Sequence, residues 1–178
     1  MSRRIQDKAS LWTGTLYYAQ GLPFSIVRQM AVVFFKDRGV SLQNLGLVSL
    51  YGIPWTFKFL WSPLVDTIST KRRWVVAMEF CLALVIGAVV CLLPMGANVQ
   101  VVAAVLLVAA FVSATHDIAT DGFYLEALNA NDRAKYSGLS VAAYRLALLT
   151  GSGLLVGISG KIGWTGTFAA AAAILAAL

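Results

Sequence analysis

The chain has 178 residues, of which 59% are hydrophobic and only 12% charged, and its formal net charge is +6. Soluble domains contain about 45–50% apolar and about 25% charged residues. A soluble fold would expose too much apolar surface to water, so the composition excludes a soluble enzyme and indicates an integral membrane protein. The length leaves room for about six membrane-spanning helices of about 20 residues each.

Six apolar stretches follow one another, separated by short clusters of charged, Gly, Pro or Asn residues. We expect helices, because a helix satisfies its own backbone hydrogen bonds in lipid and the sequence lacks the alternating pattern of membrane strands. The predicted spans are residues 11–35, 42–65, 74–94, 99–128, 138–158 and 163–178. The loops between them are short, so consecutive helices are expected to be antiparallel neighbours.

The first span contains Gly21-Leu22-Pro23, followed by an isolated Arg28. Gly and Pro can kink a helix, or they can break it and free backbone groups, as happens at the substrate sites of some transporters. Both interpretations remain open for this stretch.

Lysine and arginine are distributed unequally over the two ends of the predicted spans. One side carries Arg3, Arg4, Lys8, Lys71, Arg72, Arg73, Arg133 and Lys135, and the other carries Lys36, Arg38 and Lys161. Cytoplasmic loops are enriched in basic residues. The distribution therefore predicts a multi-pass protein of the inner (plasma) membrane with a cytoplasmic N-terminus.

Ionisable residues inside the predicted spans indicate a functional site. One charge at the bilayer centre costs between about 3 and more than about 10 kcal/mol, so such groups face partners or a water-filled cavity. By helix rise, five of them lie at similar depths in the cytoplasmic third of four spans. These five residues are Lys58, Glu79, Asp117, Asp121 and Arg145. Asp117 and Asp121 are four residues apart and therefore share one helix face.

Two interpretations of this layer remain open. Lys58 and Arg145 can pair with the acids to hold the helices in register, or they can bind an anionic solute while Asp117 or Asp121 carries a proton. Glu79 is expected to snorkel to the interface, because its span is otherwise apolar. His116 points away from the face of Asp117 and is interpreted as hydrogen-bonded structure rather than a proton relay.

The last two spans are rich in small residues. Glycines in the fifth span allow neighbouring helices to approach closely. The sixth runs into an alanine-rich tract that stops at Leu178 without a charged or aromatic anchor. We therefore expect the chain to be truncated in this sixth helix.

Several sequence blocks resemble the AmpG-type muropeptide permeases of the major facilitator superfamily. The blocks are residues 57–66 (FKFLWSPLVD), residues 113–122 (SATHDIATDG), Tyr144-Arg145-Leu146 and Gly21-Leu22-Pro23. The second resembles an S-A-x-x-D-I-x-x-D-A pattern, with Gly122 in place of the final alanine. The facilitator loop motif between spans 2 and 3 lacks its leading glycine and first arginine. Its remaining residues are Asp66, Lys71, Arg72 and Arg73.

The resemblance implies an all-α integral membrane protein, the six-helix N-terminal half of a twelve-helix transporter that works by alternating access and is coupled to protons. It implies import of anhydro-muropeptides for cell-wall recycling, without an enzymatic reaction, cofactor, metal or nucleic-acid partner. In facilitators, spans 1 and 4 line the central cavity. The residues assigned to the substrate and proton pathway are Arg28, Lys58, Asp117, Asp121 and Arg145.

Other functions remain open. Acetyl-coenzyme A transporters share a similar span 2 pattern, so the solute can be acetyl-coenzyme A or another sugar or peptide conjugate. A truncated membrane protein that does not transport is a further alternative. An intramembrane phosphotransferase is disfavoured, because the sequence lacks the additional acidic residues and the Asp-Gly–Ala-Arg block of such enzymes. The sequence also lacks a phosphate-binding nucleotide loop, which disfavours ATP coupling.

Overall fold

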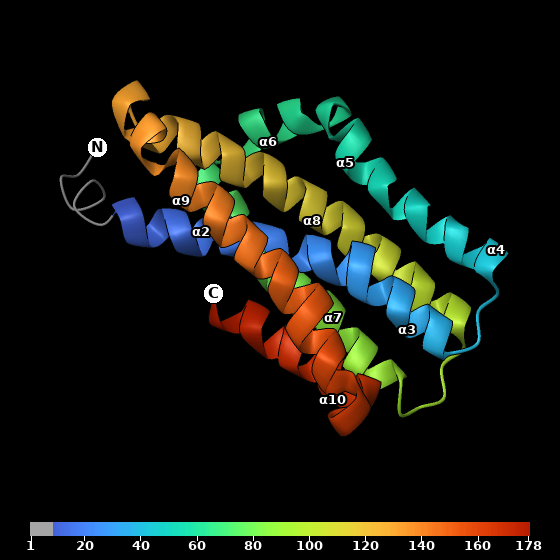
Figure 1. Cartoon of the computed structure of the whole chain (residues 1–178). Coiled ribbons are helices and arrows are strands. Elements are labelled where there is room, and N and C mark those ends of the chain that lie inside the picture. The colour runs from blue at the N-terminus through green and yellow to red at the C-terminus, as the bar shows by residue number, and fades with distance from the viewer. Residues whose placement is uncertain (1–8) are drawn as a thin grey trace.

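The computed structural model describes residues 9–178 and is all-α, without strands, over that part of the chain (Figure 1). The predicted all-helical fold of a membrane transporter is thereby confirmed. Arg3, Arg4 and Lys8, which contribute to the predicted orientation, lie outside the described residues.

The first helical column consists of α2 (Ala9–Ser25), the π-helical η1 (Ile26–Met30) and α3 (Ala31–Asp37). Pro23 lies inside α2, and the chain stays helical through it. Of the two interpretations of this stretch, a complete break is therefore wrong. The column departs from regular α-helical geometry at the π-helical turn that follows the proline, and this turn contains Arg28.

The second column is divided into short pieces. They are α4 (Leu42–Leu45), the 3-10 segment η2 (Gly46–Gly52), α5 (Ile53–Phe57), the 3-10 segment η3 (Lys58–Leu60) and α6 (Ser62–Ile68). Pro54 and Pro63 lie in the first turns of α5 and α6. Backbone N–H groups in a first turn have no partner within the helix, so a proline there costs no helical hydrogen bond. Figure 1 shows this column running along α8.

The next two helices are long and uninterrupted. They are α7 (Lys71–Leu92) and α8 (Val99–Ala127), and a side-chain cap begins each of them. The Thr70 hydroxyl accepts from the Arg73 N–H at 3.4 Å, and the Asn98 side chain accepts from the Val101 N–H at 3.0 Å. Such caps satisfy N–H groups that have no partner within the helix.

The last part of the chain contains α9 (Ala130–Leu149), the π-helical η4 (Thr150–Leu155) and α10 (Val156–Ala177). Asn129 caps α9, so residues 130–135 are helical and do not form the loop expected from their polarity. Within α10, Gly163 has a φ of +71°, a backbone conformation that favours glycine, and the chain turns sharply there.

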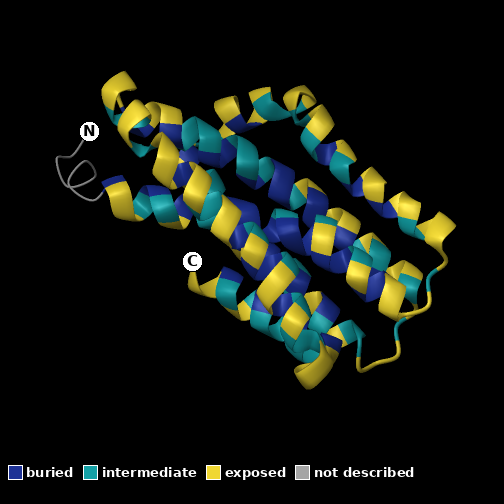
Figure 2. Ribbon diagram, in the orientation of Figure 1, coloured by how far each residue is buried: buried dark blue, intermediate teal, exposed yellow. Residues whose placement is uncertain are grey.

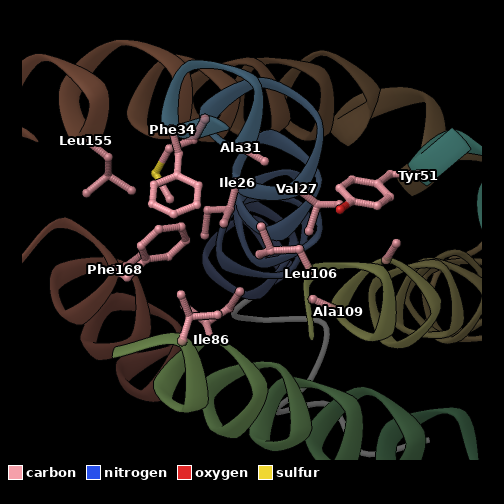
Figure 3. Close-up of a cluster of buried hydrophobic side chains, with 14 of the residues drawn as sticks. Ile26, Val27, Ala31, Phe34, Tyr51, Ile86, Leu106, Ala109, Leu155 and Phe168 are labelled. Carbon is pink, nitrogen blue, oxygen red and sulfur yellow. The ribbon is translucent and has the colours of Figure 1, made fainter. Parts of the chain in front are cut away.

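The main core lies where the first column meets α7, α8 and α10 (Figure 3). Its fully buried side chains include Leu22, Ile26, Phe34, Ile86, Leu106 and Phe168. The Phe34 ring packs edge-on against Trp164 and Phe168, with ring centroids 5.3 and 5.5 Å apart. The Trp164 indole N–H donates to Asp37 at 2.7 Å and fixes the end of α3 to α10.

The outer surface is rich in large apolar side chains, whereas the buried residues gather where helices face one another (Figure 2). Exposed examples are Phe59, Leu60, Phe80, Leu146, Leu149 and Leu154. Among the described residues, three helical stretches are long and apolar enough to cross a membrane: Lys71–Leu92, Val99–Ala127 and Ala130–Ala177. An apolar exterior of this extent suits a lipid environment. The assignment of six separate crossings stays a prediction.

Candidate functional site

A cavity of about 420 Å³ opens between α2, η3, α8 and α9, and polar side chains from all four elements line it. The lining residues are Tyr17, Gln20, Lys58, Asp117, Asp121, Ser140, Val141, Tyr144, Arg145 and Leu148. Four of the five residues predicted from their depth in the membrane therefore meet at one place. The fifth, Glu79, lies elsewhere.

Lys58 is the central charge of the cavity. Its ammonium group forms an ion pair with Asp117 and lies 3.8 Å from Asp121 Oδ2. The Asp117 side chain is only 13% exposed, compared with 46% for Asp121. The two acids lie one helical turn apart on α8, so one lysine from η3 reaches both of them.

The helix α2 contributes two uncharged donors that the sequence analysis missed. Gln20 Nε2 donates to the second carboxylate oxygen of Asp117, and the Tyr17 hydroxyl donates to Asp121 Oδ1 at 3.4 Å. Asp117 thus has Lys58 and Gln20 as partners, and Asp121 has Lys58, Tyr17 and the same Gln20 amide. Gln20 was detectable as a lone amide in an apolar stretch, and Tyr17 lies three residues before it, on the same face of the helix.

Arg145 lies on the α9 wall of the cavity with its side chain exposed. Within residues 9–178 it makes no ion pair with either aspartate. A guanidinium presents a planar set of donors that suits carboxylate and phosphate groups. Arg145 is therefore placed to contact an anionic molecule in the cavity.

Arg28 does not join this cavity. Its guanidinium donates to the backbone carbonyl of Ser49 at 2.7 Å, in the second helical column. It also lies so close to Gly52 that a Cβ at this glycine would come within 2.6 Å of Arg28 Nη1. The arginine therefore links η1 to η2, away from Lys58.

Glu79 also lies apart, and the expectation that it snorkels to the interface is wrong. It is only 9% exposed, and its Oε2 lies 3.2 Å from Nε2 of the fully buried His116. This contact involves a face of α8 other than the one that carries Asp117. The imidazole offers Glu79 a polar neighbour inside the bundle, so the carboxylate turns inward.

The residues of the loop motif meet at the start of α7. Lys71 forms an ion pair with Asp66, while Arg72 and Arg73 are exposed. The aliphatic stem of Lys71 crosses Gly122 of α8, where a Cβ would lie 2.8 Å from Lys71 Cε. The glycine in place of the usual alanine therefore gives room for this lysine, which is itself buried.

Comparison with known proteins places the chain among membrane transporters. Residues 12–104 match the family model described as Acetyl-coenzyme A transporter 1. Over 97% of its length the chain is 34% identical to the Anhydromuropeptide permease of Escherichia coli (strain K12), and it covers 36% of that protein. It is 28% identical to an uncharacterized protein of Haemophilus influenzae, over 94% of this chain and 40% of that protein.

A protein of Rickettsia felis named as a candidate AmpG transporter is 25% identical over 88% of this chain and 40% of its own length. The chain thus spans between 36% and 40% of the length of these relatives. The family model covers more than half of the chain, and the resemblance to AmpG-type permeases is confirmed. The chain therefore belongs to the acetyl-coenzyme A transporter 1 family of membrane transporters.

Proposed function

We propose that the chain forms the six-helix N-terminal half of a proton-coupled secondary transporter that works by alternating access. In this proposal its six helical columns each cross the inner membrane once, with the N-terminus in the cytoplasm. Family membership supports the class of protein. The charged cavity between α2, η3, α8 and α9 supports the mechanism.

The observation that carries the proposal is that two aspartates of α8 share one lysine. Lys58 and Gln20 hold Asp117 directly, whereas Asp121 has longer contacts, at 3.8 Å to Lys58 and 3.4 Å to Tyr17. One ammonium neutralises one carboxylate, and a second ionised carboxylate is costly in a low-dielectric site. Asp121 is therefore the proton carrier, and Asp117 is the fixed counter-ion of Lys58.

Protonation of Asp121 changes the contact between the second helical column and α8. With a proton on Asp121, Lys58 interacts with Asp117 alone; without it, the ammonium is attracted by both acids. Because Lys58 and the acids lie on different elements, the proton biases how these elements pack. Such a bias between two arrangements is what coupling to alternating access requires.

The substrate in this proposal is an anhydro-muropeptide, whose peptide carries carboxylates for the exposed Arg145 to bind. The printed name of the Escherichia coli relative supports this choice. A second candidate is another anionic solute such as acetyl-coenzyme A, which the description of the family model favours. Both substrates present the anionic groups that a guanidinium binds.

The test uses the whole protein in proteoliposomes with an imposed proton gradient. We expect Asp121→Asn to abolish gradient-driven accumulation of the anhydro-muropeptide, because the shape is kept and the titrating group is lost. Exchange of labelled for unlabelled substrate without a gradient should continue. Asp132→Asn, at the start of α9 and outside the cavity, is the matched control and should accumulate substrate normally.

Accumulation that stays undiminished in Asp121→Asn and still collapses with a protonophore would exclude Asp121 as the proton carrier. Parallel assays with labelled acetyl-coenzyme A separate the two candidate substrates. Accumulation of acetyl-coenzyme A without accumulation of the muropeptide would reverse the choice of substrate and leave the coupling mechanism intact.

A further inference from the structure

Glu79 of α7 and His116 of α8 form a second buried pair of ionisable groups, which the mechanism above does not use. Glu79 Oε2 lies 3.2 Å from His116 Nε2. The glutamate is 9% exposed and the histidine is completely buried. Apart from this mutual contact, both carboxylate oxygens and both ring nitrogens are buried without a hydrogen-bond partner among the described residues.

The described part of the chain supplies no compensating charge around the pair. Glu79 and His116 line a cavity of about 720 Å³ between α2, α7, α8 and α10, and they are its only ionisable residues within the described chain. On α2 the cavity is lined by Trp12, Thr15, Leu16 and Ala19, and on α10 by three alanines and Leu175, with Leu178 just beyond the helix. The nearest acid on α8, Asp117, lies on another face and is held by Lys58.

An ionised Glu79 beside a neutral imidazole would leave one uncompensated negative charge in an apolar environment. One added proton makes the pair neutral, either as a carboxylic acid beside an imidazole or as a carboxylate beside an imidazolium. When two such groups interact closely, the proton belongs to the pair and not to either residue. Among residues 9–178, no basic side chain lines the cavity to compete for this role.

We propose that Glu79 and His116 jointly bind one proton at neutral pH and form a second proton site, separate from the cavity around Lys58. The two sites are linked through α8, because His116 and Asp117 are consecutive residues. A displacement of α8 against α7 would change the contact of Glu79 with His116. The role of this site in transport rests on the proton coupling proposed above. The binding of a proton by Glu79 and His116 does not rest on it.

Two buried hydroxyl groups extend the polar character of the site along α8. Thr120 lies one helical turn from His116 on the same face, and Thr13 lies on α2, which packs against α8. Both hydroxyl oxygens are buried without a hydrogen-bond partner among the described residues. Buried polar atoms of this kind are the usual positions of ordered water. Thr120 therefore adds a second buried polar group to the face of α8 that carries His116.

The experiment uses the whole protein with ¹⁵N-labelled imidazole, and the His116 signal is identified by its loss in His116→Gln. At pH 7 we expect either the resonances of an imidazolium or, in the infrared spectrum, a protonated-carboxyl band that Glu79→Gln removes. Thr15→Val changes a polar residue of the same cavity without removing an ionisable group, and it should keep the wild-type signals. A neutral imidazole together with an ionised Glu79 would overturn the proposal.

A transport measurement tests the role of the site. In proteoliposomes, Glu79→Gln is expected to lose one proton per transported substrate, whereas Thr15→Val should keep the wild-type ratio. An unchanged ratio in Glu79→Gln would remove the site from the transport cycle. If the spectra show the bound proton but the wild type accumulates nothing under a proton gradient, the proposed function fails and the proton site stands.

Discussion

Lys58 is the residue on which the charged cavity depends. Its side chain is one-third exposed and its ammonium faces two acids of α8, while Gln20 and Tyr17 of α2 contact the same acids from another side. An ammonium is a compact charge with three donors, so it can serve two carboxylates at once. Its removal leaves both acids without a cationic partner among residues 9–178, although the neutral donors remain.

A double-mutant cycle on this ion pair tests that interpretation. We expect Lys58→Met to lower the thermal midpoint of the purified protein more than the double variant Lys58→Met, Asp117→Asn, because the double variant leaves one acid fewer uncompensated. The interaction energy of such contacting pairs is roughly 0.5–3 kcal/mol. The lower half of that range applies here, because Lys58 is 33% exposed and solvent screens the pair. Strictly additive effects would show that the pair contributes nothing.

Among the helices, α2 and the α9–η4 column pack closely against each other at two glycines. A Cβ at Gly21 would lie 2.8 Å from the Tyr144 carbonyl oxygen, and one at Gly151 would lie 2.4 Å from Ser25 Oγ. Small residues of this kind let helix backbones pack together in lipid, where no hydrophobic driving force is available between helices. The wall of the cavity formed by α9 is positioned by these contacts.

Gly151→Ala should therefore separate the first column from η4. We expect a loss of about 1–3 kcal/mol of stability, as for other overpacked sites, measured as a lower thermal midpoint in detergent. The control is Gly153→Ala in the same π-helical segment, where a Cβ would meet nothing within 4 Å. Equal midpoints for the two variants would contradict the close packing of Gly151.

On the scale of the whole molecule, the connections between helices divide between two ends of the bundle. Figure 1 shows the start of α2 together with the α6–α7 and α8–α9 connections at one end, and the α3–α4 and α7–α8 connections at the other. The first end carries Lys71, Arg72, Arg73, Arg133 and Lys135, and the second carries Lys36, Arg38 and Lys161. From the positive-inside rule we expect the first end to lie in the cytoplasm.

Cysteine labelling tests this orientation. In a background with Cys81 and Cys91 replaced by alanine, Met95→Cys should react with a membrane-impermeant thiol reagent added to intact cells. Thr67→Cys, at the opposite end, should react only after the membrane is opened. Both native positions are exposed, so the reagent can reach each cysteine from its own side. The reverse labelling pattern would place the N-terminus outside.

The helical fold and part of the site could be predicted from the sequence, because hydrophobicity and helix rise determine how deep a residue lies. The predicted depth in the membrane placed Lys58, Asp117 and Asp121 in one group, and the three residues do line one cavity. It does not determine the direction in which a side chain points around its helix, and for this reason Glu79 was wrongly included. Gln20 was missed because it is uncharged. Arg28 lies on a π-helical turn, whose rotation the sequence pattern does not reveal.

The two π-helical segments, η1 and η4, lie against each other in the bundle. A π-helical turn accommodates one more residue than an α-helical turn, so everything beyond it is displaced by one position, about 100° around the axis. Deletion of one residue from Ile26–Met30 would remove the extra residue, restore a regular α-helix and keep Phe34 facing Trp164 and Phe168. A conversion of the same five residues to regular α-helix without a deletion would instead rotate the rest of the column by about 100° and turn Phe34 away from them. The length of this column and its π-helical turn therefore depend on each other.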